Sequence, residues 1–273
     1  MIEIKNMFFK YAGGGEQVFR NFSLQLQANN IYGLLGKNGT GKSTLLYLID
    51  GLLRPQEGTV TVDGVVSSRR LPHTLSEIFL VPEEFDLPSV TLDEYIRLNA
   101  PFYPRFSREV LKECLNDFDL DDQLHLGKLS MGQKKKVFMS FALSANTQLL
   151  LMDEPTNGLD IPSKSQFRRV VANHMSDDRM VIISTHQVHD VEQLLDHVLI
   201  LSESQLMLNA PVAELCEKYV FEERAAGADD KDVVYAEPSV HGQSVVARRK
   251  AGMAETSLNL ELLFNATVTG AIV

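Results

Sequence analysis

Residues 36–44 read Gly-Lys-Asn-Gly-Thr-Gly-Lys-Ser-Thr, a glycine-rich loop that ends on a lysine and two hydroxyl side chains. An apolar run at 31–35 stands directly before the loop, and a helix-forming run at 45–49 follows it. Strand, glycine loop and helix in this order form a cradle for nucleotide phosphates. Glycine is needed there because phosphate oxygens must approach backbone N–H groups, and a Cβ would block them.

The loop offers both backbone and side-chain ligands. Its last residues begin a helix, whose unpaired N–H groups and positive dipole end would face an anion. Lys42 would reach the β- and γ-phosphates, and the Ser43 hydroxyl would ligate Mg²⁺. The alternative is an ordinary glycine-rich turn, which the flanking strand and helix disfavour. The predicted nucleotide-binding residues of the loop are Gly36, Lys37, Asn38, Gly39, Thr40, Gly41, Lys42, Ser43 and Thr44.

Composition narrows the classes of protein. The chain has 273 residues, 44% of them hydrophobic, which fits one large domain with or without an appendage. The net charge of −10 disfavours nucleic acid as the main partner, since phosphate neutralisation needs a basic face. Cys114 and Cys216 lack metal-ligand spacing and are interpreted as reduced thiols of a cytosolic protein. No signal peptide and no apolar run of the ~20 residues that cross a bilayer is seen, so a membrane role requires a partner.

Hydrophobic periodicity predicts alternating strands and helices. Apolar strands at 149–152 and 181–184, with a helix between them, indicate a parallel sheet buried on both faces. Thr91 and Glu94 predict a capping box at the start of a helical region that Pro101 and Pro104 interrupt. The other expected elements are strands within 1–30, broken by a turn at 12–15, strands at 59–62 and 78–82, a strand and turn at 197–208, and helices at 162–176 and 211–220.

The last fifty residues differ from the rest. Residues 223–232 are polar and small, which predicts a linker or an exposed turn. Short strands are expected at 233–235 and 244–247, and 258–268 has an apolar face at helical spacing. That face either docks on the chain's own domain or forms a dimer or regulatory contact.

Two acids end one of the apolar strands. Asp153 and Glu154 follow residues 149–152, and a carboxylate at the C-terminal end of a parallel strand faces the ligand crevice. Asp153 would hold Mg²⁺ directly or through water, and Glu154 would polarise the attacking water. Two acids that simply begin a surface loop are the alternative, which the phosphate loop upstream disfavours.

Residues 129–133, Leu-Ser-Met-Gly-Gln, precede three lysines at 134–136. Ser130 is predicted to cap a helix, and the lysines would then lie near its positive dipole end, where they oppose helix stability. A dipole end made more positive suits the binding of an anion.

The order of these motifs, with Asn-Gly-Leu-Asp at 157–160 and His186, resembles the ATP-binding subunits of ABC transporters. The resemblance covers about residues 1–220, and the signature at 129–133 is specific to this family among phosphate-loop ATPases. It implies an α/β fold: a P-loop NTPase core with a mostly parallel sheet, an N-terminal antiparallel β-subdomain and an inserted helical subdomain at about 84–145. Residues 221–273 would be a C-terminal appendage, interpreted as a small hairpin plus a helix.

The resemblance also implies a shared site. Ser130 and Gly132 would contact the γ-phosphate held by the other protomer, and Gln133 completes that signature. The active unit would be a head-to-tail dimer, of two copies or with a paralogous ATPase subunit, that encloses two ATP molecules.

Three further residues match motif positions of the family. Tyr11 would stack on adenine, and Asp160 would lie in the loop that links the two sites. His186 matches the switch histidine that holds the γ-phosphate and the water; an exposed loop histidine is the alternative reading of the residue alone.

The chain departs from the family pattern at two positions. Glu83 stands where most members have a glutamine that senses γ-phosphate and Mg²⁺. A carboxylate can ligate Mg²⁺ but cannot donate an amide hydrogen bond, so coupling would be retuned while coordination survives. Met131 replaces the usual first glycine of the signature pair, whereas Gly132 is retained.

The resemblance predicts an ATPase subunit with ATP and Mg²⁺ as ligands, Glu154 as general base, and Lys42 and His186 as stabilising groups. It would be cytoplasmic, peripheral on the inner face of the membrane, and would drive an integral membrane permease whose coupling helix docks on the helical segment. Residues 100–107, Glu83 and the appendage look like the ABC-2 exporter class. The alternatives are a soluble ABC-type ATPase acting on ribosomes or nucleic acid, and a regulatory ATP-binding subunit with weak hydrolysis.

Overall fold

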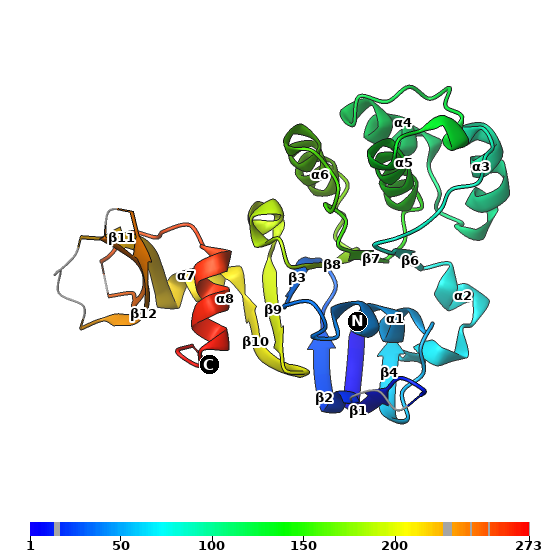
Figure 1. The fold of residues 1–273 in the computed structure, drawn as a ribbon. Coiled ribbons are helices and arrows are strands. Elements are labelled where there is room, and N and C mark those ends of the chain that lie inside the picture. The colour runs from blue at the N-terminus through cyan, green and yellow to red at the C-terminus, as the bar shows by residue number, and fades with distance from the viewer. Residues whose placement is uncertain (14–16, 226–230, 241, 251, 273) are drawn as a thin grey trace.

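A computed structural model describes residues 1–13, 17–225, 231–240, 242–250 and 252–272 (Figure 1). Its central layer is a six-stranded sheet in the order β10-β9-β3-β8-β7-β6. Neighbouring strands run parallel except for β10, which pairs antiparallel with β9. The strands are β3 (Asn30–Leu35), β6 (Ile78–Val81), β7 (Leu149–Asp153), β8 (Met180–Thr185), β9 (His197–Ser202) and β10 (Gln205–Pro211). The predicted parallel sheet is confirmed, and the expected turn after residue 202 leads into a further strand.

A second, antiparallel sheet lies below the first in Figure 1, with helix α1 (Lys42–Asp50) between the two. Its strands are β1 (Ile2–Lys10), β2 (Gln17–Leu26), β4 (Glu57–Val62) and β5 (Val65–Val66), in the order β2-β1-β4-β5. Asp63 and Gly64 turn the chain between β4 and β5 with φ of 47° and 77°, the left-handed pair of a type I′ hairpin. The expected turn at 12–15 lies partly outside the described residues, since 14–16 are not among them.

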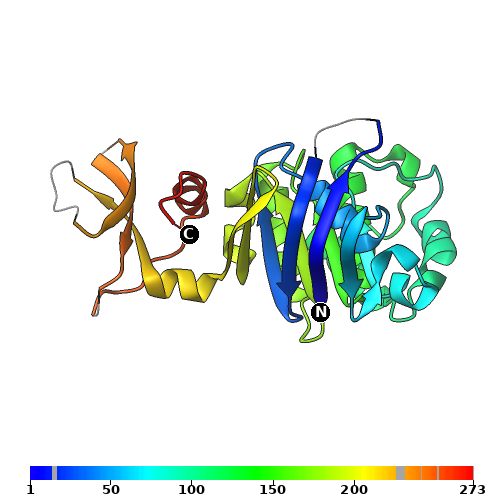
Figure 2. The ribbon, with the colours of Figure 1, turned by 90° about the horizontal axis from the view of Figure 1, so that it is seen from below.

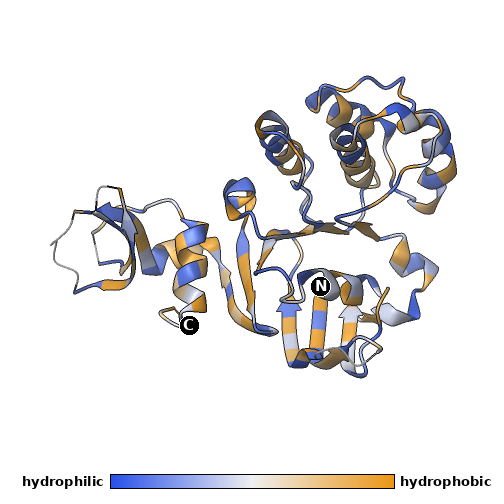
Figure 3. Ribbon diagram, viewed as in Figure 1, coloured by the Kyte–Doolittle hydropathy of each residue, from blue (hydrophilic) through white to orange (hydrophobic). Residues whose placement is uncertain are grey.

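The strands of the central sheet are apolar throughout because both faces are buried. In β8, Val181 and Ile183 belong to the core shared with the helices above, whereas Met180 and Ile182 belong to the core around α1. Side chains alternate between the two faces of a strand, so a strand covered on both sides needs apolar residues at every position. Figure 3 shows these apolar strands in the middle of the molecule.

Helices cover the other face of the central sheet (Figure 1): α3 (Leu92–Asn99), α4 (Arg108–Asp117), α5 (Met131–Ser144) and α6 (Ile161–Asn173). The short helices η2 (Ala100–Phe102) and η3 (Leu126–Lys128) connect them, and α2 (Pro72–Leu75) and η1 (Ser67–Arg69) precede β6. Pro101 lies in η2, so α3 ends before it as predicted. Of the predicted capping box, the Thr91 half is present, with its hydroxyl accepting from the Glu94 N–H at 3.2 Å. The Glu94 carboxylate lies 3.7 Å from Arg97 instead of bonding back to the cap.

The chain continues through two turns, η4 (Val188–Asp190) and η5 (Glu192–Leu194), and ends in a third, three-stranded sheet with a helix. That sheet has the order β11-β13-β12, and α8 lies between it and the β9–β10 edge of the central sheet (Figure 2). Helix α7 ends at Lys218, earlier than predicted, because the chain enters β11 at once. The bounds are α7 (Val212–Lys218), β11 (Tyr219–Arg224), β12 (Val233–Ser239), β13 (Gly242–Arg248) and α8 (Leu260–Val268).

The apolar face of α8 packs on the chain itself. Leu260, Leu263 and Ala266 are each 0% exposed and join the main core, which is the first of the two predicted alternatives. The predicted strands at 233–235 and 244–247 are confirmed within β12 and β13. Of the predicted linker, Glu223 and Arg224 belong to β11, and 226–230 lie outside the described residues. In the part of the chain that the structure describes, no helix has the length and apolar character needed to cross a membrane.

Candidate functional site

The loop 36–44 leaves β3 and opens α1, as the sequence predicts. Gly39 and Gly41 have φ of +82° and +99°, a backbone region that side chains with a Cβ rarely adopt. A Cβ on Gly36 would lie 2.5 Å from the Thr40 hydroxyl, and one on Gly41 would lie 2.9 Å from the Phe19 ring. Side chains with a Cβ would clash or be strained at these positions, so the fold of this chain requires the glycines.

Lys42 lies inside that loop. Its ammonium donates to the carbonyl oxygens of Gly36 at 2.8 Å and Lys37 at 3.3 Å, and the residue is only 6% exposed. Thr40 closes the same turn by donating to the Lys37 carbonyl at 2.9 Å. The ammonium is thus held against the backbone of the loop, and Lys42 itself begins α1, whose first N–H groups can bind an anion.

Glu154 and His186 meet at the ends of β7 and β8. Glu154 is 4% exposed, its Oε1 lies 3.6 Å from the Lys42 ammonium, and Nδ1 of His186 lies 2.8 Å from the same oxygen. The backbone N–H of His186 donates to Oε2 at 3.3 Å. Glu154 has φ of 45°, a strained value for a residue with a side chain, and strain of this kind gathers at functional sites. The structure therefore brings the three predicted catalytic side chains together.

Asp153 lies behind them and is 1% exposed. Burial raises the pKa of its carboxyl, while hydrogen bonds from the Ser184 and Ser43 hydroxyls oppose that change. Ser43 and Asp153 are therefore neighbours, as a shared cation requires. Among the residues that the structure describes, no three His, Cys, Asp or Glu side chains are grouped so that they could hold a metal ion by themselves. This donor set fits Mg²⁺, which binds one or two carboxylates together with phosphate oxygens, and does not fit a structural metal cage.

A cavity of about 330 Å³ opens above the loop. At its mouth Tyr11 is 45% exposed and its hydroxyl lies 2.9 Å from the Thr44 hydroxyl. The Phe9 ring meets the Tyr11 ring edge-on at 5.1 Å, which supports the ring from one side. The lining residues are Tyr11, Val18, Asn38, Gly39, Gly41, Lys42, Ser43, Thr44, Glu83 and Glu154. An aromatic ring, a phosphate cradle and two carboxylates thus share one cavity.

Glu83 ends a chain of hydrogen bonds that the sequence did not reveal. Its Oε1 accepts from the Asn157 amide at 2.9 Å, and the Asn157 oxygen accepts from the Gln187 amide at 2.9 Å. Lys164 in turn donates to the Gln187 oxygen at 2.9 Å. The only signal in the sequence was position, since Gln187 directly follows His186. These hydrogen bonds link the segment after β6, the loop after β7 and the loop after β8.

The signature 129–133 lies elsewhere. Ser130 caps α5 as predicted, and a capping box is present, with Gln133 Oε1 accepting from the Ser130 N–H at 3.0 Å. Ser130 and Gln133 are exposed, Met131 is 56% exposed, and a Cβ on Gly132 would meet only the Gly158 oxygen, at 4.0 Å. Among the described residues, none of the signature lines the cavity above residues 36–44. Within this chain the two motifs do not form one site.

The expectation that three lysines at 134–136 strengthen an anion site is wrong for two of them. Lys135 is 8% exposed and donates to the Asn157 carbonyl at 2.7 Å, and burial lowers the pKa of its ammonium. Lys136 donates to the Gln166 side chain at 3.0 Å. Both lysines therefore fasten α5 to neighbouring segments. The charge pattern could not show this because helix position alone does not say which face is covered.

Asp160 lies at the start of α6. Its Oδ1 accepts from the Ser163 N–H at 2.9 Å, so the residue is a helix N-cap. Hydrogen bonds from the Ser163 side chain and backbone lower the pKa of the carboxyl. The side chain is exposed, next to Ile161, which is 85% exposed. The structure thus leaves this loop uncovered, as it does the signature.

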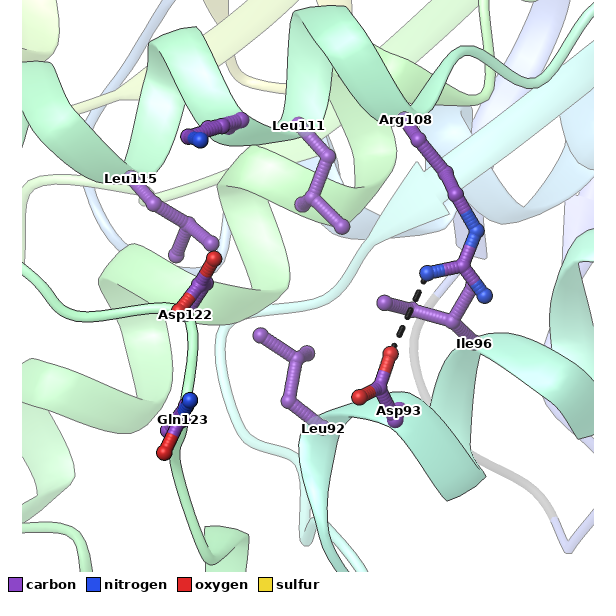
Figure 4. A pocket seen from close by; sticks show the side chains of 9 residues that line it. Leu92, Asp93, Ile96, Arg108, Leu111, Leu115, Asp122 and Gln123 are labelled. Atoms are coloured by element: carbon purple, nitrogen blue, oxygen red, sulfur yellow. Dashed lines mark hydrogen bonds and ion pairs between the residues drawn. The ribbon is translucent and has the colours of Figure 1, made fainter.

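A hollow of about 260 Å³ lies between α3 and α4 (Figure 4). Leu92, Ile96 and Leu111 line it, and Arg108 and Asp93 form an ion pair of 3.1 Å at one side. None of the residues that line it belongs to the cavity above the phosphate loop. The hollow belongs to the helical region and is separate from the nucleotide cradle.

Comparison with known proteins decides the family. The family model described as ABC transporter matches residues 19–157, which is more than half of the chain. The chain belongs to the ABC transporter family. The predicted resemblance is thereby confirmed, and with it the ATPase activity: this ABC subunit hydrolyses ATP and powers transport through a membrane subunit.

Two relatives and one solved structure illustrate the match. The ABC transporter ATP-binding protein YtrB of Bacillus subtilis is 27% identical, over 94% of this chain and 86% of its own length. The SkfA peptide export ATP-binding protein SkfE of the same organism is 28% identical, over 80% of this chain and 92% of its own length. A dimeric bacterial ABC transporter cassette is 25% identical and has a TM-score of 0.67, over 77% of this chain and 98% of its own. The predicted P-loop NTPase fold is confirmed by such cassettes.

Proposed function

We propose that this ABC subunit binds Mg²⁺ and ATP between its loop 36–44 and the signature 129–133 of a second protomer, and that hydrolysis drives export through a separate permease. One observation carries the proposal. The phosphate loop, Lys42 and Glu154 line one cavity, whereas Ser130, Met131 and Gln133 of the signature are exposed and the signature lines no part of that cavity. A γ-phosphate on the cradle would therefore be enclosed only when another chain contributes its signature.

We give each side chain a role that its position in the cavity supports. Glu154 would accept a proton from the attacking water, held in place by Nδ1 of His186 at 2.8 Å. Lys42 would move from the loop carbonyls to the β- and γ-phosphates, whose charge is stronger than that of neutral oxygens. Ser43, Asp153 and Glu83 would hold Mg²⁺, which supplies charge neutralisation to the phosphates when bound. Tyr11 would stack on the adenine at the mouth of the cavity.

Exposed apolar residues support a dimer. Met131 in the signature is 56% exposed, and Ile161, beside Asp160, is 85% exposed. Large exposed apolar side chains at the starts of two helices, α5 and α6, are typical of a protein interface. Gly132 has open space around its Cβ position, so none of the residues that the structure describes requires a glycine there. Close approach of a phosphate held by a second copy, or by a paralogue, would require it.

The permease would dock on the helical segment at 84–145. Leu98 is 53% exposed and Phe102 is 70% exposed, four residues apart at the end of α3 and in η2. Residues at this spacing share one face, so the pair forms an apolar patch that a membrane subunit could cover. The subunit would then lie on the cytoplasmic side of the membrane. SkfE, named for peptide export, supports the outward direction.

We also propose the division into an ATPase domain at 1–220 and an appendage at 221–273. The third sheet and α8 lie at one end of the molecule, beyond β10, in Figures 1 and 2. None of the residues lining the cavity above the phosphate loop comes from that sheet or from α8.

The test uses Glu154→Gln as an ATP-locked bait. Removing the general base is expected to lower turnover by about 10²- to 10⁴-fold while ATP still binds and a dimer accumulates. With ATP, the tagged variant should recover a protein with several membrane spans from solubilised membranes. The matched control for the dimer is the double variant Glu154→Gln/Gly132→Asp, which should bind ATP and accumulate no dimer.

Other outcomes contradict parts of the proposal. Unchanged turnover of Glu154→Gln would remove that residue from its role. Recovery of ribosomal material would favour a soluble ATPase acting on nucleic acid, and slow turnover of the wild type with its partner bound would favour a regulatory subunit. For direction, a strain carrying Glu154→Gln should retain the transported compound inside the cell; depletion of the compound would indicate import.

A further inference from the structure

We propose that α8 of the appendage holds the loop that carries His186 and so sets the rate of ATP hydrolysis. This inference rests on the proposed role of His186. It assigns His189, Glu192 and Glu261 as positioning residues, which act on the reaction through that loop rather than by touching ATP.

Two polar contacts connect the loop to the helix. Nε2 of His189, three residues after His186, lies 2.8 Å from the Glu261 carboxylate in the first turn of α8. Glu192 Oε1 accepts from the backbone N–H of Leu260 at 2.7 Å, so a side chain of η5 satisfies the start of α8. A carboxylate also interacts favourably with the positive dipole end of a helix. The switch loop and the helix are therefore bonded to one another at both turns, η4 and η5.

Apolar side chains of the same segment are also buried. Val191, between η4 and η5, is 0% exposed and belongs to the same core as Leu260 and Leu263 of α8. The Leu195 side chain occupies the place where a Cβ on Gly33 would lie, at 2.3 Å. Gly33 is in β3, the strand that leads into the phosphate loop. The chain after His186 is thus fixed between the strand of the cradle and the appended helix.

The loop after β8 and α8 are not closely packed against each other near His186. A cavity of about 390 Å³ lies between the loop and the helix, lined by His186, Gln187, His189, Glu261, Phe264 and Asn265. Because this space separates the loop from α8 beside His186, the hydrogen bonds at its rim decide where the loop lies. Loosening them should let His186 leave Glu154 without unfolding the core. Such a loss would reduce turnover and leave ATP binding intact, because among the described residues neither η4 nor α8 lines the nucleotide cavity.

The experiment compares Glu261→Ala and His189→Ala with the matched control Glu255→Ala in the full chain. Glu255 is in the appendage, is similarly exposed at its side chain, and pairs with Arg249 at 3.2 Å, away from the switch loop. We expect kcat to fall about threefold in the two test variants, the range of an exposed pair, with KM for ATP unchanged. The double variant should lose no more than either single one, since both remove the same contact. His189→Gln keeps a donor for Glu261 and should restore kcat.

A fluorescent reporter separates positioning from general stability. The chain has no tryptophan, so Phe264→Trp places a single indole on the cavity beside His186. ATP should change its emission, and Glu261→Ala should reduce that change. The inference is overturned if Glu261→Ala and His189→Ala keep wild-type kcat, or if Glu255→Ala loses as much as they do. It fails on its own if His186→Ala abolishes turnover while both contact variants keep wild-type kcat. If His186→Ala keeps full turnover, the proposed function fails instead.

Discussion

The loop 36–44 and the signature 129–133 both open a helix and both place a glycine close to its start, yet the structure treats them in opposite ways. In the first, Lys42 is 6% exposed, and a Cβ on Gly36 or Gly41 would come within 3 Å of other atoms. In the second, Met131 is 56% exposed, and a Cβ on Gly132 would meet its nearest neighbour at 4.0 Å. The first glycines serve this chain's own fold, whereas Gly132 has no such use within it.

This difference supports the proposed site shared between two protomers. A residue that the fold requires is explained by its contacts, as Gly41 is by Phe19 and by a φ of +99°. A glycine at the second position of a helix costs stability and is explained only by something that approaches from outside.

The largest expected effect is that of Gly132→Asp. An acid in the first turn of α5 interacts with the helix dipole and should stabilise the free protein by about 0.3–1 kcal/mol. The same charge would repel the γ-phosphate, and turnover should fall by about 10²- to 10³-fold, as when a transition-state donor is lost. Thermal melts and steady-state ATPase assays measure the two effects. Turnover at the wild-type level would show that no phosphate approaches Gly132.

Gly41→Ala should show the opposite pattern. The new Cβ lies 2.9 Å from the Phe19 and Val18 side chains, on a backbone with φ of +99°. Strain of this kind costs about 1–3 kcal/mol, so both the melting temperature and ATP affinity should fall, the latter by about tenfold. Isothermal titration of the isolated protomer measures the affinity. Gly132→Ala is the matched control: it should leave the ATP affinity of the isolated protomer unchanged and raise the melting temperature slightly, because alanine is the better helix former. Equal losses of melting temperature and affinity in the two variants would contradict this expectation.

Asp153→Asn should stabilise the nucleotide-free protein while removing Mg²⁺-dependent ATP binding. Burial raises the pKa of this carboxyl above 3.8, so the folded protein holds its proton more tightly than the unfolded chain. The stability that this proton contributes is present below about pH 4 and is lost as pH rises through the folded pKa. Asparagine keeps an acceptor for the Ser184 hydroxyl. Its melting temperature should match the wild type in acid and exceed it at neutral pH by a few degrees, about 2–4 °C per kcal/mol. A difference that is constant across pH would contradict the assignment.

The smallest effect is expected for Glu83→Gln. Glutamine still offers an oxygen to the Asn157 amide, now 2.9 Å away, and adds a donor. The stability of the free protein should not change. Partner-stimulated turnover should change by about fivefold or less, since charge-assisted and neutral hydrogen bonds differ by about 1 kcal/mol. Glu84→Gln, the exposed neighbour, is the control. If Glu83→Gln leaves both basal and stimulated turnover unchanged, position 83 does not tune coupling.

Local patterns sufficed for the residues whose role depends on their neighbours in sequence. The order of apolar run, glycine loop and helix predicted β3, the cradle and α1, because each is specified by periodicity and by backbone conformations that glycine allows. The acids at 153–154 were placed at the cradle because a parallel sheet brings the ends of its strands together. The Ser130 cap was predicted for the same local reason.

Contacts between segments far apart in the chain could not be predicted from the sequence. Lys135 looked like part of an anion site and instead bonds the Asn157 carbonyl at 2.7 Å, and the bonds joining Glu83, Asn157 and Gln187 cross three loops. In the appendage, the sequence showed the apolar face of 258–268. It did not show that the Glu261 carboxylate contacts His189.

The sequence by itself determined a phosphate cradle, the two acids beside it and a family, since these depend on short-range spacing. Only the tertiary structure decided that the cradle is complete within one chain and the signature is not. It also decided that the C-terminal helix rests on the loop of His186. Burial and hydrogen-bond partners arise when segments far apart in the chain pack together, and no local pattern states which surface each side chain will meet.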